Sequence, residues 1–146
     1  MTGTYRLLDD IALADTAFEA EGDTPTELCG IAARALMELM ADPATIGTTW
    51  THTVECAAED LGELLFDWLN QLVFLKDAHG VLFHDVRVRV TEGRAAPQWR
   101  LQADLRGAPV DPTSQELRAD VKAVTKHLYR VMPSGTHWRA RVVVAV

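Results

Sequence analysis

Lysine is scarce in this sequence, and clustered positive charge is missing. Lys76, Lys122 and Lys126 are the only lysines, the arginines are scattered, and the 146 residues carry a formal net charge of −7. We therefore expect no direct binding to nucleic acid, because phosphate contacts need a clustered positive face. The charge remains compatible with an indirect role, through a partner that itself binds RNA.

Cysteine is also rare. Cys29 and Cys56 are the only two cysteines, and they lie far apart in the sequence. Their spacing matches no metal-binding motif. A reduced pair of buried cysteines is the prediction, and a disulfide or a metal pair is the alternative.

The common catalytic motifs are absent too. The sequence has no P-loop, no GxGxxG after a strand, no HExxH and no GxSxG. Its five histidines show no paired ligand spacing, and we expect His52 to be a packed core residue. A metal-dependent hydrolase is the least favoured hypothesis, because no nucleophile and general base can be paired. We predict that the protein is not an enzyme.

Targeting signals are missing from the start of the chain. Met1 to Tyr5 have neither the basic nor the apolar region of a signal peptide. The longest apolar segment, of about 17 residues, carries several ionisable groups and is a poor membrane span. We expect a cytoplasmic protein without membrane association.

That longest apolar segment, Leu61 to Asp77, predicts a core helix. Its polar side chains are confined to one wedge, and its apolar positions recur at helical spacing: Leu61, Leu64, Leu65, Trp68, Leu72 and Leu75. Asp60 is the expected N-cap and Gly80 the expected stop. A second helix is predicted from Pro25 to about Met40, because Thr24 and Glu27 form a capping box.

Seven alternating or β-branched segments predict strands around these helices. They lie at residues 5–8, 13–21, 49–56, 82–91, 99–105, 128–132 and 138–146. The pairs 82–91 with 99–105 and 128–132 with 138–146 are expected to be hairpins, whereas 116–125 suits a short helix or a strand. We predict an α+β fold: a single two-layer domain over residues 1–146, with a mostly antiparallel sheet and two main helices packed on it.

Acidic side chains near the N-terminus are candidates for a metal site. Asp9, Asp10 and Asp15 are three carboxylates within seven residues, and they could bind a hard cation such as Ca²⁺ or Mg²⁺. A solvated acidic loop is the alternative. Asp67 on the long helix needs a cationic partner unless its wedge faces solvent, and Lys122 is the candidate for that partner.

Several stretches together resemble the archease family, in order and in spacing. They are YRLLDDIALADTAFEAEG, DTPTEL, LLFDWLNQLVFLKD, ELRADVKAVTKH and WRARVVVAV, and they cover nearly the whole chain. The most specific pieces are DWLN at 67–70 and VKAVT at 121–125.

The resemblance implies an accessory protein of an RtcB-type RNA ligase, which is then the expected partner. Archeases promote guanylylation and multiple turnover of this ligase in tRNA splicing or RNA repair. The alternative that the resemblance leaves open is a general protein chaperone or structural binding module that has lost a metal site.

The resemblance also implies a divalent metal ion, Ca²⁺ above all, and a functional lysine. Asp15 matches a family aspartate that binds the metal, and Val146 matches the terminal position, whose carboxylate is a ligand. Ala145 stands where the family has an aspartate, which implies weaker binding or loss of the metal. Asp10 falls near a family histidine and is a further candidate ligand, while Lys122 matches a lysine important to family activity.

Overall fold

The computed structural model describes residues 2–8 and 15–146, which form two α-helices and seven strands. In chain order the elements are β1 (Gly3–Leu8), β2 (Asp15–Gly22), α1 (Pro25–Met40), the 3-10 helix η1 (Pro43–Thr45), β3 (Trp50–Ala58), α2 (Leu61–His79), β4 (Val81–Glu92), β5 (Trp99–Pro109), β6 (Ala123–Ser134) and β7 (His137–Ala145).

Both helices begin and end where the local sequence predicts. The Thr24 side chain accepts a hydrogen bond from the Glu27 amide at 3.1 Å, and Asp60 accepts one from the Glu63 amide at 2.8 Å. These bonds satisfy amides that have no partner in the first turn of a helix. Gly80 ends α2 in the left-handed region, with φ 61° and ψ 41°, which glycine adopts without steric cost.

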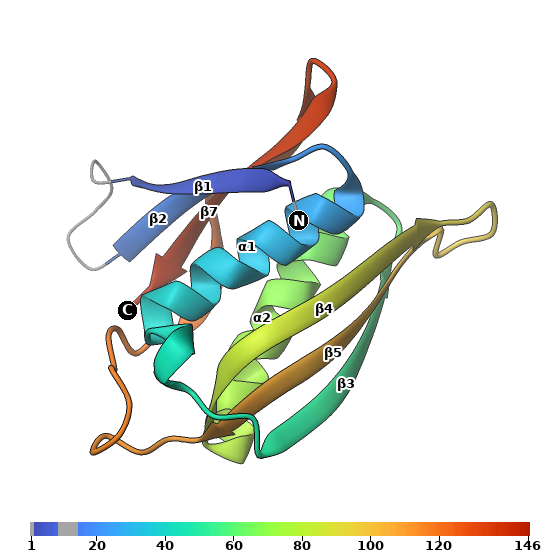
Figure 1. Cartoon of the computed structure of the whole chain (residues 1–146). Coiled ribbons are helices and arrows are strands. Elements are labelled where there is room, and N and C mark those ends of the chain that lie inside the picture. The colour runs from blue at the N-terminus through green and yellow to red at the C-terminus, as the bar shows by residue number, and fades with distance from the viewer. Residues whose placement is uncertain (1, 9–14) are drawn as a thin grey trace.

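The strands form two antiparallel sheets, in the orders β1-β2-β7-β6 and β3-β5-β4. The helices lie between the sheets (Figure 1): α1 contacts β2 and β4, and α2 contacts β3 and β6. The α+β class and the two packed helices are confirmed. The arrangement differs from the predicted two layers because the strands divide into two sheets, each covering one side of the helical layer.

Both predicted hairpins are present; β4, β5 and β6 are longer than predicted, and β7 is shifted by one residue. β5 continues to Pro109, into the segment predicted as a loop, and β6 already begins at Ala123. The ambiguous segment 116–125 is neither a helix nor one strand. Leu117 forms a single bridge with Ala41, and residues 118–122 have no regular structure.

The core is centred on α2, as its apolar pattern predicts. Trp68 is completely buried, and its indole Nε1 donates a hydrogen bond to the Cys29 carbonyl of α1 at 3.1 Å. The bond satisfies the one polar atom of that side chain where water has no access. Each fully buried leucine of α2 contributes about 1.5–3 kcal/mol through removal from water.

Neither α1 nor α2, the two α-helices within residues 2–8 and 15–146, is long and apolar enough to cross a membrane.

Candidate functional site

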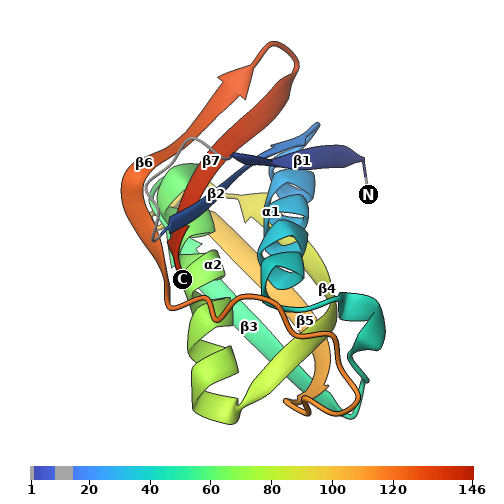
Figure 2. The same ribbon diagram turned by 90° about the vertical axis from the view of Figure 1, so that its left-hand side faces the viewer.

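Residues predicted to be functional lie together at one end of the four-stranded sheet. Asp15, the first residue of β2, is the register partner of Ala145, near the end of β7, and Val146 follows directly. The backbone amide of Lys122 donates to the Ala145 carbonyl at 2.8 Å. Figure 2 shows the start of β2 beside the end of β7 and the C-terminus. The fold therefore brings Asp15, Lys122 and Val146 together, while Asp10 lies outside the described residues.

The two most specific sequence pieces, DWLN and VKAVT, are in direct contact. The Asn70 side-chain oxygen accepts from the Val124 amide at 3.1 Å, and its nitrogen donates to the Val124 carbonyl at 3.4 Å. The same nitrogen donates to the Phe66 carbonyl within α2 at 3.3 Å. Asn70 thus fixes the chain just after Lys122 to the central helix.

A buried lysine fixes the same segment just before Lys122. Lys76 is 8% exposed, and its Nζ lies 2.6 Å from an Asp77 oxygen and 3.0 Å from an Asp120 oxygen. Burial lowers the pKa of Lys76, but the two aspartates outweigh it and leave the pKa above its usual value. Lys76 in turn lowers the pKa of Asp120. Exposed Lys122 therefore lies between two attachments to α2.

The predicted partnership of Asp67 with Lys122 is wrong. Asp67 is exposed, because the polar wedge of α2 faces solvent. Partial desolvation and then the neighbouring Glu63 raise the pKa of Asp67, and the cation that opposes them is Lys126. Lys126 pairs with Glu63, and its Nζ lies 4.2 Å from the centre of the Phe66 ring.

Sequence reasoning missed the role of Lys76, although a signal was present. Lys76 comes four residues after Leu72, on the apolar side of α2. A lysine at such a position needs a carboxylate partner. The partner Asp120 is 44 residues away in sequence, so the pattern alone did not identify it.

The residues predicted to bind a metal ion provide only some of the oxygen ligands that it needs. Asp15 supplies one carboxylate, Ala145 opposite supplies only a methyl group, and the predicted third donor is the carboxylate at Val146. No group of three or more histidine, cysteine or acidic side chains suited to a metal occurs among residues 2–8 and 15–146. A calcium ion takes six to eight oxygen ligands. These side chains alone do not complete such a shell.

His52, His84 and the two cysteines have no catalytic or metal-binding arrangement around them within the part of the chain that the structure describes. His52 is half-buried and stacks on Trp50 with ring centroids 5.5 Å apart, and His84 bonds through Nδ1 to the Ile46 carbonyl at 2.7 Å. Both cysteines are free, and Cys29 is buried as predicted, whereas Cys56 is only half-buried. Burial raises the pKa of Cys29 to about 12, and partial burial raises that of Cys56 to about 11. Since the thiolate is the nucleophile, neither cysteine is activated at neutral pH.

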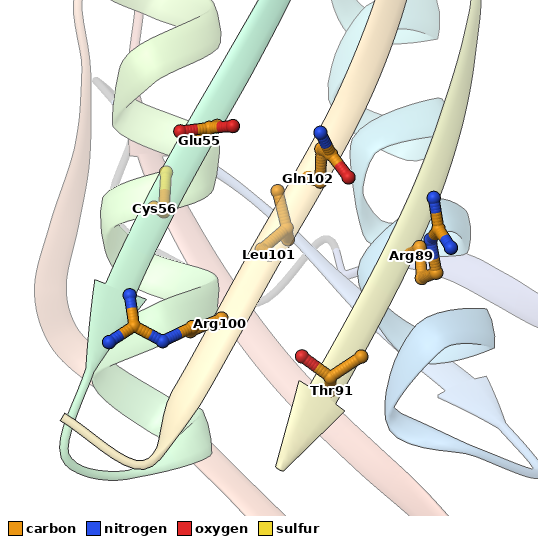
Figure 3. Close-up of a pocket in the computed structure, with 7 residues that line it drawn as sticks. All are labelled: Glu55, Cys56, Arg89, Thr91, Arg100, Leu101 and Gln102. Carbon is orange, nitrogen blue, oxygen red and sulfur yellow. The ribbon is translucent and has the colours of Figure 1, made fainter. Parts of the chain in front are cut away.

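A hollow of about 350 Å³ lies on the three-stranded sheet, lined in part by Glu55, Cys56, Arg89, Arg100 and Gln102. Figure 3 shows Arg100 reaching toward β3 while Arg89 points away from it. The two guanidinium groups do not converge on one point, and the thiol is protonated at neutral pH. This hollow therefore offers no catalytic arrangement.

The chain matches the model of the archease protein family (MTH1598/TM1083) over residues 5–146. It is 36% identical over 131 residues to "Protein archease" of Methanopyrus kandleri, covering 90% of this chain and 92% of that one. It is 34% identical to "Protein archease" of Archaeoglobus fulgidus, covering 97% and 98%.

Two solved structures share the fold. The solution structure of Methanobacterium thermoautotrophicum protein 1598 superposes with a TM-score of 0.80 at 27% identity, covering 97% of this chain and 98% of that one. The crystal structure of an archease, possible chaperone, from Thermotoga maritima gives a TM-score of 0.64 at 23% identity, covering 92% and 93%. The second similarity shows the fold alone.

Proposed function

The chain belongs to the archease family, and from this premise we propose that it is an accessory protein of an RtcB-type RNA ligase. It promotes guanylylation of the ligase and its multiple turnover in tRNA splicing or RNA repair. The protein is not itself the catalyst. The main observation behind the proposal is that Asp15, Lys122 and Val146 lie together at one end of the four-stranded sheet.

Lys122 suits contact with a partner because it is exposed while its backbone is fixed. Asp120 before it is paired with Lys76, and Val124 after it is bonded to Asn70. A cation held in this way loses little backbone freedom when it meets an acidic or phosphate group of a partner. The ammonium supplies a positive charge, and the ligase supplies the reacting groups.

A divalent metal, Ca²⁺ by family resemblance, would bind Asp15 and the carboxylate at Val146. It would add positive charge beside Lys122. With Ala145 in place of an aspartate, the site has one fewer anionic donor, and we expect weak affinity because ligand charge is a main determinant of it. The contribution of Asp15 is then to hold a cation loosely or to contact the partner itself.

A general chaperone or structural binding module is the second candidate. Two exposed apolar side chains, Val110 at 44% and Leu117 at 41%, favour it. Both line a hollow of about 350 Å³ beside Lys76 and Arg118. An apolar surface of this kind can contact unfolded clients. Suppression of aggregation of unrelated proteins, without any effect on the ligase, would support this candidate and contradict the first.

The direct test measures guanylylation of a purified RtcB-type ligase by GTP, with and without this protein, in several divalent metal ions. We expect acceleration by the wild type, and we expect Lys122→Ala or Asp15→Ala to reduce it about tenfold, which is ~1.4 kcal/mol of barrier. Lys126→Ala is the matched control, because Lys126 is an exposed lysine four residues further on. Equal acceleration by all variants, or none by the wild type in any metal, would refute the proposal.

A further inference from the structure

A second cluster of charge lies on the outer face of the four-stranded sheet, away from the helices. It surrounds a hollow of about 130 Å³ that is lined by Glu19, Arg130, Met132, Arg139 and Arg141. Three arginines around one small hollow stand out in a chain with a net charge of −7.

Two of these arginines face each other directly. Arg130 on β6 and Arg141 on β7 are register partners in adjacent strands. Like charges in this position repel and destabilise a sheet. The arrangement is unfavourable for the protein alone and becomes favourable when an anion lies between the two guanidinium groups.

Carboxylates nearby are already engaged elsewhere. Glu19 pairs with Arg6 at 3.1 Å, and Glu21 pairs with Arg139 at 2.7 Å. Neither Arg130 nor Arg141 forms an ion pair with any residue in the ranges 2–8 and 15–146. Arg130 and Arg141 are therefore left without an ion pair, although the Glu19 carboxylate also lines the hollow and Glu19 is the register partner of Arg141 on β2.

Arg141 is held in place by the backbone of β6. Its Nε donates to the Leu128 carbonyl at 2.8 Å, and Leu128 has a positive φ of 53° within an irregular part of the strand. This bond uses one donor of a guanidinium that has five. The terminal nitrogens stay available for a ligand.

The size of the hollow restricts the ligand. Its 130 Å³ is roughly four times the ~30 Å³ that a water molecule occupies in the liquid. One oxyanion of four or five heavy atoms fits inside, and because the hollow is open to solvent, a larger ligand would place only a phosphate group there. Guanidinium groups bind the oxygens of phosphate in pairs.

We propose that Arg130 and Arg141, with Arg139 beside them, form a binding site for a phosphate dianion, either free phosphate or a terminal phosphate monoester. The site lies four residues along β2 and β7 from the Asp15–Ala145 pair, which is roughly 14 Å at ~3.4 Å per residue. Asp15 and Glu19 are on the same face of β2, since side chains alternate along a strand. The inference concerns binding by the isolated protein and does not rest on the proposed role with the ligase.

The test is calorimetric titration of the isolated protein with inorganic phosphate in phosphate-free buffer. We expect a dissociation constant of about 1 mM for the wild type, weakened about tenfold in Arg130→Ala and in Arg141→Ala. Arg34→Ala is the matched control, because Arg34 is an exposed arginine on α1 in an ion pair with Glu38. Lack of saturable binding by the wild type, or equal affinity in Arg130→Ala, would overturn the proposal.

Thermal unfolding supplies a second test, in which Arg130→Ala should raise the melting temperature without phosphate and reduce the stabilisation that phosphate gives. In phosphate-free buffer Arg130→Ala should melt above the wild type, because the repulsion with Arg141 is removed. Phosphate at about ten times the wild-type dissociation constant should raise the wild-type melting temperature by about 4 °C and that of Arg130→Ala by only about 1 °C. An equal phosphate-dependent increase in both proteins would contradict the site.

Short RNA oligonucleotides of one sequence distinguish the source of the phosphate. Tighter binding of an oligonucleotide ending in a 3′-phosphate than of inorganic phosphate identifies an RNA end as the ligand. Equal affinity for the 3′-phosphate oligonucleotide and for inorganic phosphate identifies the free ion as the ligand. Equal binding of the 3′-phosphate and 3′-hydroxyl oligonucleotides, both tighter than binding of inorganic phosphate, would show that the protein binds the RNA backbone and would overturn the proposal of a terminal or free dianion.

Discussion

Replacement of Asn70 with alanine would remove the side chain that joins α2 to the start of β6. Val124 is 4% exposed, so its main-chain amide and carbonyl have little access to water once Asn70 is gone. An unsatisfied buried group costs about 1–3 kcal/mol. The amide bond at 3.1 Å contributes most of this, and the carbonyl bond at 3.4 Å contributes less because it is longer.

The alanine that replaces Asn70 offsets part of this destabilisation. It is a better helix former than asparagine by up to about 0.7 kcal/mol, so the expected net destabilisation by Asn70→Ala is about 2 kcal/mol. For a chain of this length that corresponds to a fall of about 6 °C in melting temperature. The assay is thermal unfolding, followed together with hydrogen exchange of the Val124 amide, which should become faster.

Gln71→Ala is the matched control. Gln71 is the next residue of α2, is half-buried, and has no side-chain hydrogen bond to any part of the chain that the structure describes. A decrease in the free energy of unfolding of less than about 0.5 kcal/mol in Asn70→Ala, or a decrease equal to that in Gln71→Ala, would refute the reasoning. Unchanged exchange of the Val124 amide would refute it independently.

Two further predictions concern Ala145 and Asp67. Ala145→Asp places a second carboxylate opposite Asp15 and should tighten Ca²⁺ binding about tenfold, measured by calorimetry; no gain over the wild type would exclude a metal site there. The pKa of Asp67 is raised in the folded protein, first by desolvation and then by Glu63, so its ionisation is disfavoured there and stability falls as pH rises through that pKa. Asp67→Asn should therefore melt slightly above the wild type at pH 7 and equally at a pH where Asp67 is protonated; an identical difference at both pH values would contradict this.

Local signals predicted the elements of this fold well. The helix starts at Thr24 and Asp60 and the helix end at Gly80 depend only on residues within one helical turn, so the local sequence is enough to predict them. The division into two sheets has no such local cause. It depends on β7 pairing with β2 rather than with β5, and both choices suit the same apolar pattern.

The candidate site was only partly predictable, for a similar reason. Asp15 was a candidate from its acidic cluster and from family resemblance, and the functional role of Lys122 came from the resemblance alone. The fold then places both residues at one end of the sheet. The attachment of Asp120 to Lys76 joins residues 44 positions apart. The facing pair Arg130 and Arg141 depends on a register that shifts within β6, between Thr125 and Arg130, and alternation along a strand does not predict such a shift.

The strand order β1-β2-β7-β6 has a consequence for biosynthesis. The three-stranded sheet and both helices consist of residues up to Pro109, whereas the other sheet needs β7 between β2 and β6. Since β2 leaves the ribosome well before β7, it lacks this inner neighbour until β7 has been made. The end of the sheet that holds Asp15 and Lys122 is thus assembled after the helical core, and a nascent chain arrested before β7 carries that core without this end of the sheet.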